Sequence, residues 1–210
     1  MEMLHVFGYL SALVIGISLG LIGGGGSILA VPVLAYLFSI SEKAATAYSL
    51  FIVGASALVG GWQQHLKGYV DWRTAIVFGF PAIIGVTLVR HYVVPAMPDV
   101  FGSITGLIGA GGGFLIIPAL VILANVEMKV AVGTSLIIIA IKSLMGFFLG
   151  DALTMEIDWN FLALFTGLSF IGIFIGSYLS NFIDGKKLKK GFGYFILVMS
   201  AFIFYMEFFK

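Results

Sequence analysis

The stretch GLIGGGGSILAVP, residues 20–32, places four consecutive glycines between two apolar segments. A closely related stretch, GLIGAGGGFLIIP, recurs later in the chain at residues 106–118. Glycine has no Cβ and destabilises the interior of a helix. The two stretches therefore predict two interruptions in sequence that is otherwise apolar.

The composition of the chain is that of an integral membrane protein. Its 210 residues are 60% hydrophobic and 10% charged, and the mean hydropathy is +1.13. Crossing the hydrocarbon core takes roughly 20 apolar residues. Several windows of this length lack the alternation of strands, so we expect an all-α fold. The predicted spans are residues 3–22, 44–62, 74–94, 130–150, 160–183 and 191–208.

Other features of the composition exclude several kinds of function. The chain has no cysteine, which excludes disulfides and cysteine-ligated metals, and a net charge of +1 predicts no nucleic-acid partner. The three histidines fall near span ends without metal-ligand spacing, so we expect neither a metal nor another cofactor. The first apolar segment has no basic residues before it, so we expect it to stay in the mature protein rather than act as a signal peptide.

The two halves of the chain are related along much of their length. Between residues 20–34 and residues 106–120, nine of fifteen positions are identical, and further downstream Ser49 aligns with Ser135. We interpret this as an internal duplication with repeats at 1–98 and 99–210. Paired interrupted segments in matching positions of two halves indicate a transporter binding site.

The charges of equivalent loops indicate how the repeats are oriented. The loop QQHLKGYVDWR, residues 63–73, carries Lys67 and Arg73, whereas its counterpart DALTMEIDWN has three acids and no base. Cytoplasmic loops are enriched in Lys and Arg. We therefore expect an inverted repeat with glycine-rich broken or re-entrant helices. The cluster DGKKLKK, residues 184–190, should be cytoplasmic, which leaves the C-terminus outside.

The glycine stretches are candidate anion sites. Irregular backbone at membrane depth survives only where it is buried in protein or lines a wet cavity. A short helix of about twelve residues follows each stretch, and its first N–H groups and dipole favour an anion. The alternative is tight helix packing at a sharp turn. The candidates are Gly23, Gly24, Gly25, Gly26, Ser27, Gly109, Gly111, Gly112 and Gly113.

Lys142 is a charged residue near the middle of a predicted span. A lysine there costs about 2.5–3.5 kcal/mol on insertion scales, so by default it indicates a functional site. Ser135 and Gly146 share its helix face. Hydroxyls in membrane helices often bond to their own backbone, so four hydroxyl residues are weaker candidates: Thr134, Ser135, Ser49 and Ser143. The alternative is a structural lysine, neutral or hydrogen-bonded to carbonyls.

Two further sets of residues have predicted structural roles. Gly167, Gly172 and Gly176 are small enough to let membrane helices approach closely. Aromatic residues at span ends are expected to act as interfacial anchors. These are Trp62, Tyr69, Trp72 and Trp159.

The paired glycine motifs, with AVGTSL at residues 131–136 and VDW at residues 70–72, resemble the sulfite exporter TauE/SafE family of membrane permeases. The resemblance implies export or exchange of small sulfur-containing anions, such as sulfite or sulfonates, across a bacterial inner membrane and coupled to an ion gradient. Family halves usually carry a further span and a polar linker. Here VVPAMPDVFGSITGLIG, residues 93–109, joins the repeats directly.

The leading interpretation is a multi-pass transporter in the lipid bilayer whose partner is a small anion. A passive anion channel is the second. An enzyme is a weak third, because no predicted span contains paired carboxylates, a histidine cluster or an activated nucleophile. A structural scaffold would not explain Lys142, and the sequence leaves a homo-oligomer open.

Overall fold

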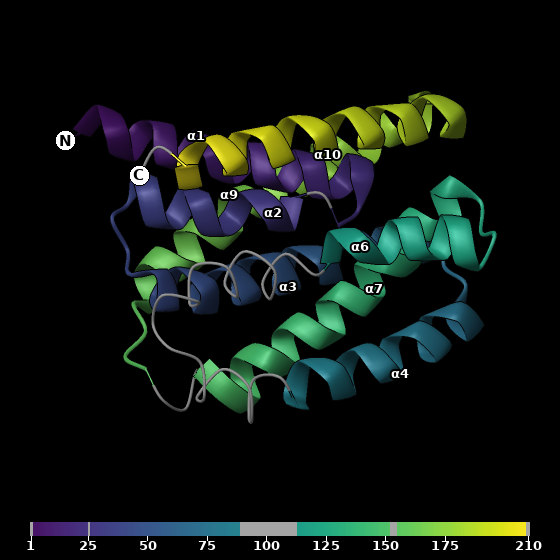
Figure 1. Ribbon diagram of the computed structural model, residues 1–210, viewed down its shortest axis with the longest axis horizontal. Helices are drawn as coiled ribbons and strands as arrows, with labels where there is room; N and C mark the ends of the chain where they lie inside the picture. The colour runs from purple at the N-terminus through teal and green to yellow at the C-terminus, as the bar shows by residue number, and fades with distance from the viewer. Residues whose placement is uncertain (1, 25, 89–112, 152–154, 209–210) are drawn as a thin grey trace.

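The part of the chain that the structure describes folds as helices joined by short loops (Figure 1). The structure is a computed structural model that describes residues 2–24, 26–88, 113–151 and 155–208. No strand occurs in these ranges, as the all-α prediction requires. The elements are α1 (Glu2–Ile22), α2 (Gly26–Pro32), η1 (Val33–Leu37), α3 (Glu42–Leu66), α4 (Trp72–Leu88), α6 (Gly113–Pro118), η5 (Ala119–Leu123), α7 (Met128–Gly146), η6 (Phe147–Asp151), α9 (Trp159–Phe182) and α10 (Gly185–Phe208).

Several of these helices are suited to a bilayer. Within the described ranges, three are long and apolar enough to cross a membrane: Lys43–Leu66, Met128–Leu149 and Trp159–Phe182. Each predicted window overlaps an observed α-helix, and the window 130–150 also includes most of η6. The last differs most, because α10 begins at Gly185 and takes the lysine cluster into its first turns. The first glycine stretch does not continue α1, which ends at Ile22, into α2, which begins at Gly26.

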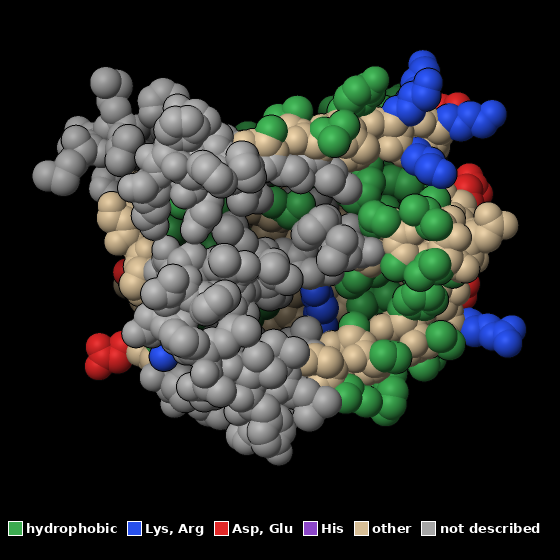
Figure 2. All heavy atoms as spheres, in the orientation of Figure 1, with side chains coloured by type: hydrophobic (Ala, Val, Ile, Leu, Met, Phe, Trp, Pro, Cys, Tyr) green, Lys and Arg blue, Asp and Glu red, His purple; other side chains and the backbone are tan. Residues whose placement is uncertain are grey.

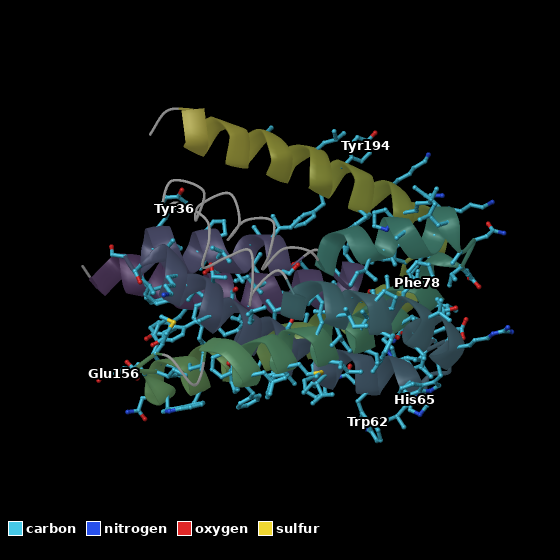
Figure 3. All side chains as sticks on the ribbon, turned by 60° about the horizontal axis from the view of Figure 1, so that its bottom comes forward. Tyr36, Trp62, His65, Phe78, Glu156 and Tyr194 are labelled. Carbon is cyan, nitrogen blue, oxygen red and sulfur yellow. The ribbon has the colours of Figure 1, made fainter. Side chains whose placement is uncertain are left out.

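Apart from the buried Lys142, the described charged residues gather at two opposite ends of the bundle. We call one of them the basic end, which consists of residues 64–73, 127–132 and 180–190. Beside it, Lys67 Nζ donates to Ser177 O (3.2 Å) and joins the end of α3 to α9. The other is the acidic end, which consists of residues 39–48 and 155–161. There Asp158 N–H donates to the Tyr48 hydroxyl (2.9 Å). Figure 2 shows most blue side chains at the right and one recessed in the middle, and Figure 3 shows His65 and Glu156 at opposite ends.

Helices α3 and α7 run in opposite directions. Helix α3 runs from the acidic end to the basic end, and α7 returns from the basic end. Their register is antiparallel: a Cβ added to Gly61 would lie 2.7 Å from Ile137 Cδ1, and one added to Gly54 would lie 3.0 Å from Leu144 Cγ. Ser56 therefore lies at the level of Lys142. Figure 1 also places both termini at the end opposite the start of α10.

Helices α1 and α9 pack backbone to backbone through glycines. A Cβ added to Gly20 would lie 2.6 Å from Ile173 O, and one added to Gly172 would lie 3.0 Å from Gly16 Cα. Small residues permit this approach. The prediction holds for Gly172 and Gly176, but it is wrong for Gly167, because a Cβ there would have nothing within 4 Å.

Gly172, which contacts α1, and Gly167, which has open space around it, provide a matched stability test. Gly172→Val should lower the free energy of unfolding by roughly 1–3 kcal/mol, the usual cost of overpacking, because its side chain would meet the backbone of α1. Gly167→Val adds the same atoms to the same helix, but at a position with open space around it. Thermal unfolding of both variants in detergent checks this, and an equal loss for the two would contradict the α1–α9 contact.

Candidate functional site

The first glycine stretch interrupts the chain between α1 and α2. Gly23 N–H donates to Leu19 O (2.7 Å), which closes α1, and Ser27 Oγ donates to Gly24 O (2.6 Å) at the start of α2. Gly23 has a φ of +75°, a conformation that glycine adopts at no steric cost. The predicted interruption is present here, and its backbone conformation requires glycine at position 23.

The interruption is packed against both halves of the chain. A Cβ added to Gly23 would lie 2.7 Å from Ser135 Oγ on α7 and 3.0 Å from Ile117 Cδ1 on α6. At Gly26 a Cβ would lie 2.6 Å from Leu19 Cγ on α1. The sequence grouped Gly23 and Ser135 as candidate site residues, and the structure places them side by side.

The two short helices that follow the glycine stretches have the same local structure. Each contains a proline, Pro32 in α2 and Pro118 in α6, and each continues into a five-residue π-helix, η1 or η5. Each is followed by one non-glycine residue with positive φ, Ser39 (52°) or Asn125 (51°). The sequence duplication is therefore also a duplication of local structure, and the predicted short helix after each stretch is present.

The structure describes only part of the predicted glycine set. Gly23 and Gly24 lie in the first interruption, and Gly26 and Gly113 are the first residues of α2 and α6. The other candidate glycines lie outside the described residues. These are Gly25, Gly109, Gly111 and Gly112.

Lys142 lies inside the bundle on α7. It is 6% exposed, and Ser56 at its level on α3 is fully buried. Among the described residues, no hydrogen bond or ion pair joins its ammonium to another group. At about 1.5 Å per residue, Ser135 lies about 10 Å away on the same face of α7. An ammonium without a partner among the described residues, in such a place, favours an anion or water.

The candidate hydroxyls differ in what they can do. Ser27, Ser49 and Ser135 each donate to a carbonyl of their own chain segment, at 2.6, 2.7 and 2.9 Å. This agrees with the expectation that membrane hydroxyls bond to nearby backbone. Thr134 Oγ1 accepts from Asp71 N–H (3.0 Å). Thr134 therefore holds the α3–α4 loop at the basic end, and the structure does not bring it to the interruption.

A row of buried hydroxyl side chains on α9 was not predicted from the sequence. Ser169 is fully buried, and Ser56 Oγ donates to its hydroxyl (2.9 Å). Thr166 Oγ1, one turn earlier, is buried without a partner among the described residues. The spacing Thr166, Ser169, Ser177 and Ser180 places small polar residues at helical intervals, which was the available signal. Through its bond to Ser56, Ser169 adds a further hydroxyl at the level of Lys142.

Lys67 lies at the basic end, outside the spans, with its ammonium hydrogen-bonded to α9. Lys67 Nζ donates to Ser177 Oγ (3.3 Å) and Asn181 Oδ1 (3.1 Å). Partial burial, and then the charge of Lys129, lowers the pKa of Lys67 from its usual value. Two ammonium groups therefore lie close enough to repel each other. In the described part of the chain, no three His, Asp or Glu residues are grouped so as to hold a metal ion.

Comparison with known proteins supports a role in membrane transport. A probable membrane transporter protein of Xylella fastidiosa strain 9a5c is 26% identical over 237 aligned positions, which cover 90% of each chain. One of Methanocaldococcus jannaschii is 33% identical over 110 residues, covering 50% of this chain and 41% of its own. The first alignment is longer than the 210 residues here, so that relative contains residues without a counterpart in this chain.

The family comparison covers both halves. The sulfite exporter TauE/SafE family matches residues 9–101 and again residues 90–203. No solved structure matches the chain significantly. Because the two matches together span most of the sequence, the chain belongs to the sulfite exporter TauE/SafE family, a family of membrane transporters.

Proposed function

We propose that the protein is an ion-coupled secondary transporter of small inorganic or organosulfur anions, such as sulfite or sulfonates. The observation that carries the proposal is Lys142, a buried ammonium that has no partner among the described residues. A cation at that depth is costly unless something compensates it. An anion that enters and leaves can supply this compensation, and the family assignment is consistent with such a substrate.

The proposal includes an inverted repeat built from residues 1–98 and 99–210. Its support is the antiparallel course of α3 and α7 and the matching short helices α2 and α6. A pseudo-two-fold axis between α3 and α7 would pass near Ser56 and Lys142. Lys142 would then lie close to this axis, where an anion from either side can reach it.

The proposed orientation has the basic end in the cytoplasm of a multi-pass inner-membrane protein. The basic end carries Lys67, Arg73 and the lysines of α10, and cytoplasmic loops are enriched in such residues. Because the chain has no cysteine, single cysteines can report sidedness cleanly. In intact cells, an impermeant maleimide should label Glu156→Cys but not Lys187→Cys. The reverse pattern would contradict this orientation.

Flux measurements test the function itself. Purified protein in proteoliposomes should take up radiolabelled sulfite or a sulfonate down an imposed ion gradient, whereas empty liposomes should not. A passive anion channel is the alternative, and it would give uptake that neither saturates nor responds to the coupling gradient. Absence of flux for every anion in a panel of sulfite, sulfate, thiosulfate and sulfonates would contradict both functions.

A further inference from the structure

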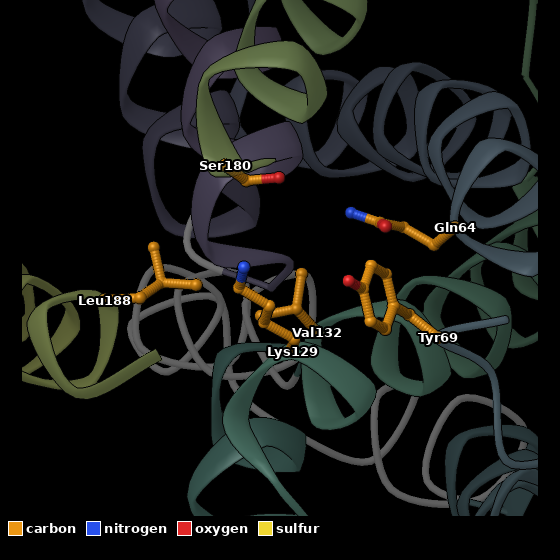
Figure 4. Close-up of a pocket in the computed structure, with 6 residues that line it drawn as sticks. All are labelled: Gln64, Tyr69, Lys129, Val132, Ser180 and Leu188. Atoms are coloured by element: carbon orange, nitrogen blue, oxygen red, sulfur yellow. The ribbon is translucent and has the colours of Figure 1, made fainter. Parts of the chain in front are cut away.

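A small polar pocket lies at the basic end, separate from the glycine interruption (Figure 4). It lies between the ends of α3 and α9 and the beginnings of α7 and α10. Its volume is about 10 Å³, which is room for about one water molecule. The lining residues are Gln64, Tyr69, Lys129, Val132, Ser180 and Leu188.

The polar groups of the pocket point toward one another. Figure 4 shows the Lys129 ammonium, the Gln64 amide and the Tyr69 hydroxyl directed toward a common space. Gln64 is only 3% exposed and lines the pocket. Amide, ammonium and phenol groups can all donate. Several donors directed at one space favour an acceptor there.

The charge of the residues that line the pocket favours an anion as that acceptor. The lining contains Lys129 and no carboxylate. Lys67, whose ammonium is repelled by Lys129, is held beside it by Ser177 at the end of α9. An anion between these lysines would relieve the repulsion and accept a hydrogen bond from the Gln64 amide.

The pocket also lies next to the candidate site. Val132 lines it, and the Val132 carbonyl accepts the hydrogen bond from Ser135 Oγ. Ser135 in turn lies against Gly23. About one turn of α7 therefore separates the pocket from the interruption.

We propose that this pocket is an entry subsite, where a small anion binds at the basic end before it moves to the central site. The inference rests on the proposed function, since it gives the transporter a second anion site on the path from the basic face. The pocket must widen to hold an anion. The Lys129 side chain, which is only partly buried, makes this room by moving outward.

The test compares Lys129→Met and Gln64→Leu with Lys186→Met, an exposed lysine at the same end that does not line the pocket. Sulfite KM is measured from each side of proteoliposomes with a known protein orientation. Lys129→Met should raise KM from the basic side about tenfold or more, since a hydrogen bond to a charged group contributes about 1.5–3 kcal/mol. KM from the acidic side should not change. Gln64→Leu should act in the same direction, and Lys186→Met should match the original protein.

Two results would overturn the subsite while leaving transport intact. One is an unchanged KM on both sides for Lys129→Met and Gln64→Leu. The other is an equal effect of Lys186→Met, which would indicate only the general surface charge. If the unaltered protein carries no sulfite, the proposed function fails. The subsite is then judged by equilibrium dialysis with radiolabelled sulfite, where Lys129→Met should remove one bound anion; unchanged binding would overturn it.

Discussion

Lys142→Met is expected to abolish anion transport in a protein that still folds. Methionine fills similar space and is less costly in an apolar interior than an ammonium, so thermal stability in detergent should stay the same or increase. The lost charge-assisted hydrogen bond should weaken sulfite binding by tenfold to more than a hundredfold, from about 1.5–3 kcal/mol. Sulfite affinity and flux of the purified variant, beside its unfolding temperature, measure both effects.

Two variants serve as controls for Lys142→Met. Lys43→Met removes an exposed lysine at the acidic end and should leave affinity unchanged. Lys142→Arg keeps the charge and should lose less than the methionine variant, although the planar guanidinium differs from a point charge. A folded Lys142→Met protein with normal affinity would make this lysine a structural residue and leave anion binding to the glycine stretches.

Gly23→Ala is expected to have the second-largest effect, on both stability and transport. Its φ of +75° is left-handed, which costs a residue with a Cβ about 1–2 kcal/mol. The added Cβ would also lie 2.7 Å from Ser135 Oγ, so the Ser135 hydroxyl or the backbone at Gly23 would have to move. Unfolding temperature and flux should both fall, and the additional substitution Ser135→Ala should restore part of the loss.

Gly68→Ala isolates the backbone part of that effect. Gly68 has a φ of +77°, and a Cβ there would have nothing within 4 Å. It should therefore cost stability by strain alone and leave transport intact. If Gly68→Ala and Gly23→Ala lose the same stability and Ser135→Ala restores nothing, the close contact between the interruption and α7 is wrong.

The sequence was most informative where hydropathy and repetition carry the signal. Apolar windows predicted the long helices, and the duplicated motifs predicted the matching short helices that follow them. The faces of these helices could not be predicted in the same way. A membrane helix such as α9 is apolar on most sides, so no amphipathic stripe distinguishes its buried face. For that reason Gly167, which has open space around it, was grouped with Gly172.

In the candidate site, too, the sequence does not show which neighbour each side chain contacts. Thr134 and Ser135 are adjacent in sequence, but successive residues of a helix point in directions about 100° apart. Thr134 bonds the α3–α4 loop, whereas Ser135 lies against Gly23. Likewise, the hydrogen bond between Ser56 and Ser169 joins helices that are distant in the chain. Such pairings depend on tertiary packing, which the linear pattern does not contain.

Counterflow is the measurement that tests alternating access to a central anion site most directly. Proteoliposomes loaded with unlabelled sulfite are diluted into a trace of radiolabelled sulfite, with no ion gradient imposed. A carrier whose site faces one side at a time should accumulate label transiently above its equilibrium level, and Lys142→Met should remove this overshoot. Label that rises to equilibrium without an overshoot in the unaltered protein, or an overshoot that persists in Lys142→Met, would contradict the account.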